Sequence, residues 1–233
     1  MHRPEQRPIY TLLKFGAEEH MQALRANGLL YMRPLADFAK EEESDIGRGD
    51  RSEGTTTIIQ PKHVEKLIFD TGNAGLGKIT VSPLEDLAGP VRIRLNKTAS
   101  CNVYCMVAVR TLVDGELVPS EVTRLGNWFV IVTNVREFIR RVVLAAKEQN
   151  NGVSYLESGL VEYYDDEEYS GEIGRFRKRR SQFEYQSEFR IVVEPGLAVA
   201  RKLFVGNLFD ITSEVLPSSA ALQGWRCAAN QKN

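Results

Sequence analysis

The sequence is poor in three features that would define its class at once: cysteine, long apolar runs and net charge. Its three cysteines, Cys101, Cys105 and Cys227, cannot form a closed set of disulfides, and no zinc spacing surrounds them. Reduced, buried thiols are the expected state. No apolar run approaches the roughly 20 residues that a membrane-spanning helix needs. The first eight residues also lack the apolar segment of a signal peptide, so we expect a cytoplasmic protein without a membrane partner.

The low net charge argues against functions that depend on attracting nucleic acid through the charge of the whole molecule. The chain has 30 Lys and Arg residues against 31 Asp and Glu residues, which leaves a formal net charge of -1. The whole-molecule field therefore gives no attraction to nucleic acid, and such a partner would need a local patch. The 233 residues, 42% of them hydrophobic, suffice for one large domain. We expect a single domain over 1–233, with a core at about 9–210 and a C-terminal extension over 211–233.

Short β-type runs outnumber helices along the chain. Branched and aromatic residues predict strands at 9–15, 29–32, 101–109, 128–133 and 183–193, among others. Helical spacing predicts a helix over 17–27 that ends at Gly28, and a second helix after Asn134 with Glu137 at the capping-box position. Many strands with few helices favour an α+β fold built mainly on antiparallel sheets.

The late strand at 183–193 is the most informative segment. Side chains of a strand alternate between its two faces, so Gln186, Glu188 and Arg190 share one polar face opposite an apolar one. One interpretation of this polar face is the solvated side of an antiparallel sheet. The other is the floor of a polar cleft, with Gln186 and Glu188 pointing into it together.

Gln186-Ser187-Glu188 resembles the Gln-x-Glu end motif of ADP-ribosyltransferases. In that family the final glutamate lies at the base of the NAD cleft, binds the nicotinamide ribose and stabilises the oxocarbenium-like transition state. A fixed carboxylate suits this task because positive charge develops on the sugar as nicotinamide leaves. The resemblance implies Glu188 as the catalytic carboxylate and Gln186 as the residue that positions the acceptor. Arg190, on the same predicted face, is a candidate contact for the cofactor.

Two earlier segments extend this resemblance. The family's first motif has an Arg or His on an early strand, then a glycine and a helix that ends near Gly-Leu, and the segments 12–16 and 28–30 are similar in order and spacing. Lys14 stands where Arg or His is expected, and a lysine contacts phosphate or ribose only as a point charge. Tyr104 matches a position that lines the nicotinamide pocket. The resemblance implies a split β-sandwich that binds NAD through Lys14 and Tyr104, although an ordinary strand-end lysine and a core tyrosine fit the sequence as well.

The chain also resembles an uncharacterised bacterial and phage family over about residues 9–210. The shared features are a Leu-x-Lys-Phe opening strand, an acidic loop that ends near Asp50 and Glu53, and a closing segment that runs from Arg180 to Arg190. Members of that family tend to lie in mobile-element or defence settings. This second resemblance implies a role in the conflict between phage and bacterium.

Two charged segments are candidate contact surfaces. A basic cluster directly precedes the late strand and consists of Arg175, Arg177, Lys178, Arg179 and Arg180. It fits an exposed loop balanced by the acidic run before it, or a contact for a nucleic acid, a nucleotide or a protein target. The acidic loop 41–54 fits a solvated, mobile loop, or a set of oxygen ligands for a divalent cation. Its spacing matches no calcium loop, and we assign no metal site.

Three functions are open on the sequence alone. The first is an NAD-dependent ADP-ribosyltransferase or NAD glycohydrolase centred on Glu188. The second is a non-enzymatic protein that binds a nucleotide or another protein, which Lys14 in place of Arg or His favours. The third is a metal-dependent nuclease that uses the acidic loop.

Overall fold

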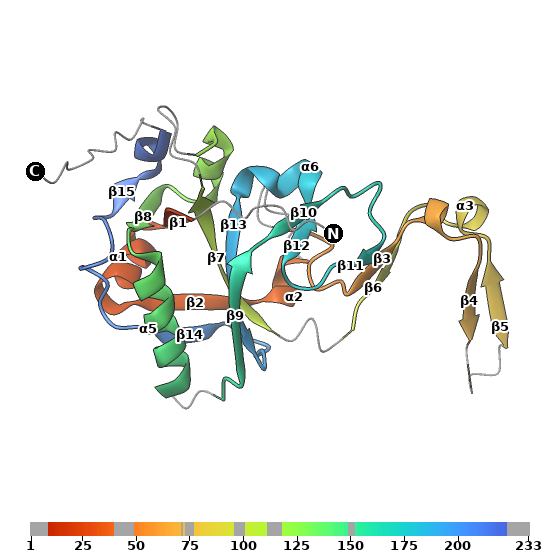
Figure 1. Ribbon diagram of the computed structural model, residues 1–233, viewed down its shortest axis with the longest axis horizontal. Helices are drawn as coiled ribbons and strands as arrows, with labels where there is room; N and C mark the ends of the chain where they lie inside the picture. The colour runs from red at the N-terminus through yellow and green to blue at the C-terminus, as the bar shows by residue number, and fades with distance from the viewer. Residues whose placement is uncertain are drawn as a thin grey trace, which may run out of the picture.

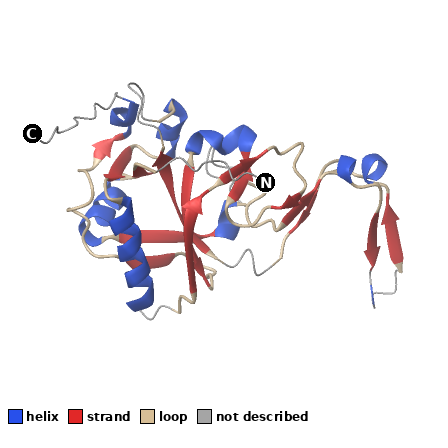
Figure 2. Ribbon diagram, in the orientation of Figure 1, coloured by secondary structure: helices blue, strands red, loops and turns tan. Residues whose placement is uncertain are grey.

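Helices and antiparallel strands are mixed in the fold, which confirms the α+β class (Figure 2). The computed structural model describes residues 9–39, 49–70, 72, 77–95, 101–110, 118–148 and 152–222. The helices are α1 (Glu18–Asn27), α2 (Leu35–Phe38), α3 (Pro83–Asp86), α5 (Val135–Glu148) and α6 (Arg180–Phe183), with 3₁₀ turns at Pro61–His63, Ser120–Leu125, Glu184–Gln186 and Ser218–Leu222. The strands are β1 (Thr11–Gly16), β2 (Leu29–Pro34), β3 (Thr57–Ile59), β4 (Leu67–Asp70), β5 (Lys78–Val81), β6 (Val91–Ile93), β7 (Asn102–Val109), β8 (Trp128–Val132), β9 (Tyr155–Leu160), β10 (Glu162–Tyr164), β11 (Gly171–Glu172), β12 (Arg177–Arg179), β13 (Glu188–Glu194), β14 (Arg201–Phe204) and β15 (Leu216–Pro217).

The largest sheet is centred on β7 and splits along one of its edges (Figure 1). Its strand order is β14-β2-β7-β1-β8-β15, and β13 pairs with β7 and β9. β13 follows one edge of β7, whereas β1 and β2 divide the other edge between them. β1 pairs with 107–109 of β7 and β2 with 102–103, so none of the described strands pairs with that edge at 104–106. The sheet therefore opens between β1 and β2.

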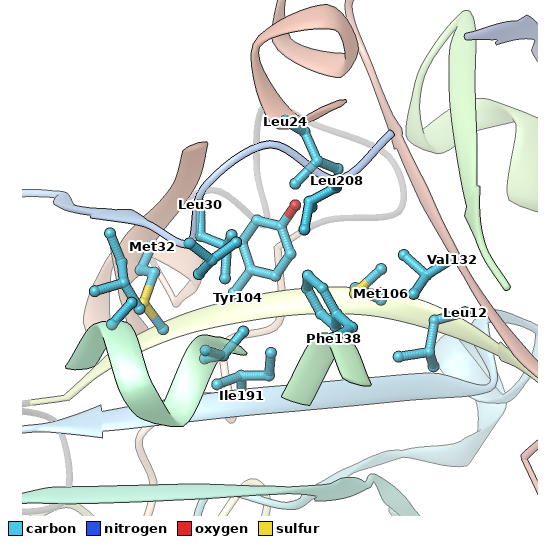
Figure 3. Packing of buried hydrophobic residues seen from close by; sticks show 14 of the residues in the cluster. Leu12, Leu24, Leu30, Met32, Tyr104, Met106, Val132, Phe138, Ile191 and Leu208 are labelled. Atoms are coloured by element: carbon cyan, nitrogen blue, oxygen red, sulfur yellow. The ribbon is translucent and has the colours of Figure 1, made fainter. Parts of the chain in front are cut away.

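The two faces of this sheet are covered differently. On one face, α1 and α5 pack against a large apolar cluster that includes Leu24, Phe138 and Ile191 (Figure 3). The opposite face carries two smaller clusters, one containing Phe129 and the other containing Leu35. Charged residues of β13 occupy the same face as these smaller clusters, because the side chains of a strand alternate.

Both predicted long helices are confirmed with their caps. Gly28 ends α1 in the left-handed conformation, at φ 62°, where a residue without Cβ is favoured. α5 begins directly after Asn134, whose side-chain oxygen accepts the backbone N–H of Glu137 at 3.0 Å. In the described ranges, no helix combines the length and the apolar character needed to cross a membrane.

A smaller, separate β region projects from the main sheet. β3, β6 and β11 form a three-stranded sheet, and the β4–β5 hairpin extends beyond it (Figure 1). The hairpin exposes apolar side chains, among them Ile68, Phe69 and Ile79. It lies away from the split in the main sheet, so it does not contribute to the pocket described below.

The late strand starts later than the alternating pattern predicts. The predicted strand covers 183–193, but α6 ends at Phe183, a 3₁₀ turn follows, and β13 begins only at Glu188. Ser187 separates the two segments in a left-handed conformation, with φ 41°. Before Ser187 the buried side chains are Phe183 and Gln186, three residues apart, and Phe183 lies under Lys178 with its ring centroid 4.3 Å from the ammonium nitrogen. A short alternating run does not distinguish a strand from such a turn.

Candidate functional site

A pocket of about 730 Å³ lies where β1 and β2 separate along β7. Its volume is within the range of roughly 300–1,000 Å³ that is typical of small-molecule sites. β1, β2, β7, β13 and the start of α1 supply most of its wall. All five residues that the sequence suggested for catalysis or cofactor binding line it: Lys14, Tyr104, Gln186, Glu188 and Arg190.

Arg190 is the centre of a buried ion network at the inner end of the pocket. Its side chain is 1% exposed and its Nε donates to Oε1 of Glu188 at 2.7 Å. Its two terminal nitrogens donate to the two carboxylate oxygens of Glu53, at 2.7 and 3.1 Å. The fork of the guanidinium matches a carboxylate in this way, so one arginine fixes two acidic residues.

Lys178 completes the network from the opposite side. Its Nζ donates to Oε1 of Gln186 at 3.0 Å and to Oε2 of Glu188 at 3.1 Å, and it lies 3.9 Å from Oε1 of Glu53. Gln186 and Glu188 thus converge on one cation, although they do not share a strand. The left-handed residue Ser187 between them turns the chain so that both side chains reach Lys178.

The two carboxylates of the network differ in their affinity for a proton. Burial by itself raises the pKa of Glu188, but the charges of Arg190 and Lys178 outweigh this effect and hold the pKa below its usual range. For Glu53 burial outweighs the same two cations and raises the pKa. Glu188 therefore gives up its proton at lower pH than Glu53 does.

Two neighbours fix the position of Glu188 further. Its backbone N–H donates to the hydroxyl oxygen of Tyr163 at 2.8 Å. The thiol of Cys105 forms a side-chain hydrogen bond with its carboxylate, and burial together with the nearby charge raises the pKa of Cys105 to about 12. Cys105 is therefore a neutral thiol near neutral pH, next to the carboxylate of Glu188.

Lys14 and Tyr104 have structural roles at the split in addition to lining the pocket. The Nζ of Lys14 donates to the carbonyl oxygen of Cys105 at 2.7 Å, at the edge of β7 that β1 and β2 leave open. It also lies 4.2 Å from the ring centroid of Tyr104. Tyr104 is 3% exposed and packs among Leu24 and Leu208 in the large apolar cluster (Figure 3). Lys14 thus binds the β7 edge where the sheet is open, and Tyr104 belongs to the apolar core beside it.

The basic cluster is only partly the exposed loop that the sequence suggested. Lys178 and Arg179 are 4% and 3% exposed, and Nε of Arg179 donates to Oδ1 of Asp50 at 2.8 Å. These two side chains therefore point inward, and their interpretation as contacts for an external target is wrong. The other three cations form ion pairs nearer the surface: Arg175 with Glu194, Arg177 with Glu162, and Arg180 with Glu184. Arg180 is the most exposed of them.

The acidic loop supplies partners to arginine rather than a cluster of metal ligands in its described part. Asp50 and Glu53 are buried and pair with Arg179 and Arg190, respectively. Among the described residues, no group of three or more His, Cys, Asp or Glu side chains is placed to hold a metal ion. Residues 41–48 of this loop and Cys227 lie outside the described residues.

Sequence reasoning did not select Glu53 as a site residue, and it assigned Lys178 to a different role. The one available signal was the pair Asp50 and Glu53, which the resemblance to the uncharacterised family included without a function. No spacing rule connects Glu53 to Arg190, because the two residues are 137 positions apart.

No family model matches the chain, and neither the curated proteins nor the solved structures contain a match. Its function is therefore inferred from the geometry of the pocket.

Proposed function

We propose that the pocket binds NAD and that the protein uses it in an ADP-ribosyltransferase-like reaction, with Glu188 as the catalytic carboxylate. The observation that supports this proposal is that residues from three separate segments of the sequence line one pocket: Lys14, Tyr104, and the group Gln186, Glu188 and Arg190. A pocket of this volume at the open part of a sheet is also a common kind of ligand site.

The charges of the lining support an anionic ligand. The cations of the lining are Lys14, Arg33, Lys178, Arg190 and Lys202. Its carboxylates are Glu53 and Glu188, so positive charges exceed negative charges by three. A concave wall with this surplus raises the local concentration of a ligand that carries phosphates.

Glu188 has the properties that the reaction requires of its carboxylate. It is ionised, and Arg190, Lys178 and Tyr163 hold it in place. In the proposed reaction the glycosidic bond between nicotinamide and the ribose breaks, and nicotinamide leaves as a neutral molecule with the bonding electrons. A nucleophile of the target, or water, then bonds to the ribose carbon and gives up its proton. The fixed negative charge stabilises the positive charge that develops on the sugar in between.

A second function is supported by the same ion network. Arg190 and Lys178 both bind Glu188, so much of its negative charge is already offset. A carboxylate in this state stabilises an oxocarbenium ion less strongly than one with a single partner. A protein that binds the nucleotide without cleaving it, as a sensor or inhibitor in phage defence or counter-defence, is therefore the alternative proposal.

Measurements of NAD binding and of nicotinamide release on the Glu188→Gln variant separate the two proposals. Glutamine keeps the shape of the side chain and removes its charge, so we expect release to fall about 100-fold or more. The release assay is run with and without cell lysate as a source of acceptors. Glu184→Gln, which changes an exposed carboxylate just before β13, is the matched control and should release nicotinamide like the wild type.

Each outcome favours one proposal. Release that is lost in Glu188→Gln but kept in Glu184→Gln supports the transferase. Binding of NAD by the wild type without any release supports the non-enzymatic alternative. If folded wild-type protein neither binds NAD nor cleaves it, the proposal that this pocket is an NAD site is wrong.

A further inference from the structure

The pocket wall includes an exposed section, here called the open end, that takes no part in the ion network around Arg190, which is here called the inner end. Tyr31 on β2 and Lys202 on β14 line this end. They are direct partners across the two antiparallel strands, and both are exposed, Tyr31 by 53%. Arg33 lies two residues beyond Tyr31 and also lines the pocket. The open end thus combines an accessible aromatic ring with two cations.

The alternation of both strands fixes these side chains on the pocket side. Leu30 and Met32 flank Tyr31 and are completely buried in the large apolar cluster. Leu203, which follows Lys202, is buried in the same cluster. Successive side chains of a strand point to opposite faces, so Tyr31 and Lys202 must point away from that core. Their position is a consequence of the fold and not of a flexible loop.

The two ends of the pocket differ in their charge balance. Both carboxylates of the lining, Glu53 and Glu188, lie at the inner end, where Arg190 and Lys178 bind them. At the open end the charged lining residues are Arg33 and Lys202, which are both cations. Lys202, which is exposed, therefore offers a positive charge to a phosphate at the open end.

We infer that the open end binds the adenosine diphosphate part of NAD, with Tyr31 stacked on the adenine base and Lys202 beside the diphosphate. This inference rests on the proposed function, because it takes the nicotinamide ribose to lie near Glu188 at the inner end. An aromatic ring stacks on any base through its face, and a lysine next to it supplies the positive charge that a phosphate needs. Arg33 lies with its guanidinium 5.0 Å from the ring centroid of Phe38 and adds a second cation to this end.

The test compares NAD with its two halves as ligands in calorimetric titrations. We expect Tyr31→Ala to weaken the binding of NAD and of ADP about tenfold, because stacking on one base is lost. The same variant should bind nicotinamide mononucleotide within about twofold of the wild type, since that ligand has no adenine to stack. Lys202→Ala should weaken ADP by a smaller factor of about three, and this factor should shrink as salt is added.

Phe204→Ala is the matched control. Phe204 is exposed on the same strand as Lys202, two residues away, and is not part of the pocket lining. This variant removes an exposed ring without touching the proposed subsite, so its affinities for all three ligands should equal those of the wild type.

The outcomes separate the inference from the proposed function. If the wild type binds NAD and Tyr31→Ala binds NAD and ADP equally well, the adenine subsite is wrong while the NAD site stands. If Tyr31→Ala weakens nicotinamide mononucleotide as much as ADP, the orientation of the ligand is wrong. If the folded wild type binds none of the three ligands, the inference and the proposed function both fail.

Discussion

One face of the central sheet is filled by a continuous apolar cluster, whereas the opposite face carries a buried ion network between two smaller clusters. Arg190 and Ile191 show the contrast best, because they are neighbours on β13, point to opposite faces and are almost completely buried. Apolar contacts add up without strict geometry, but a buried charge is tolerated only when each of its partners is present. A network of this kind adds little net stability, which is consistent with a role in binding or catalysis.

The largest expected effect comes from breaking the network at its centre. Arg190→Met keeps the approximate length of the side chain but leaves Glu53 and Glu188 without their main cation, so we expect a loss of about 3–5 kcal/mol of unfolding free energy. Urea unfolding followed by circular dichroism measures this loss. Adding Glu53→Gln to Arg190→Met removes one of the stranded charges, and the double variant should recover part of the stability.

Ile191→Val is the matched change on the apolar face. It removes one methylene from the neighbouring residue, and we expect it to cost about 1 kcal/mol. If Arg190→Met costs no more than Ile191→Val, the charged face does not depend on its ion pairs and the contrast between the two faces is wrong.

A smaller effect should appear in the pH dependence of stability. The pKa of Glu188 is lower in the folded protein than the ordinary value of 4.5, so its contribution is present above pH 4.5 and is lost as the pH falls below it. The pKa of Glu53 is raised, so its contribution has the opposite sign and declines as the pH rises through the folded-state pKa. We therefore expect acid to destabilise Glu188→Gln less than the wild type, and Glu53→Gln more.

Urea midpoints at several values between pH 7 and pH 3 check both signs on the two single variants. The exposed change Glu184→Gln serves as the control for a simple loss of one carboxylate. If the urea midpoints of Glu188→Gln and Glu53→Gln fall equally as the pH is lowered, the network does not give the two carboxylates different pKa values.

Local rules predicted much of the fold from the sequence. The cap formed by Asn134 and the left-handed Gly28 depend on neighbours within a few residues, and both are confirmed at their predicted positions. The α+β class is confirmed as well, because it follows from the number of short β-type runs. The opening of the sheet between β1 and β2 was not predicted, because it depends on which strands share the edge of β7.

The candidate site was less accessible to sequence reasoning. Gln186 and Glu188 were expected on one strand, yet they meet at Lys178 through a turn. A spacing of two residues was compatible with both arrangements. Glu53 was not selected because its partner Arg190 is 137 residues away, and only the folded chain brings the two together. Pairings of this kind depend on topology rather than on any local pattern.

The smallest expected effect concerns Ser187, the residue at which the predicted strand is interrupted. Its φ of 41° is unfavourable for a side chain, and glycine adopts it without that cost but loses more entropy on folding. These two effects nearly cancel, so Ser187→Gly should stay within about 0.5 kcal/mol of the wild type. Ser187→Val should cost about 1–3 kcal/mol, because a branched side chain fits the left-handed region poorly.

Ser158→Val, on the regular strand β9 beside β13, is the control and should be tolerated, since valine favours strands. If Ser187→Val is as stable as Ser158→Val, the left-handed turn is not what brings Gln186 and Glu188 to Lys178, and a continuous strand from 183 to 193 becomes the better description of this face.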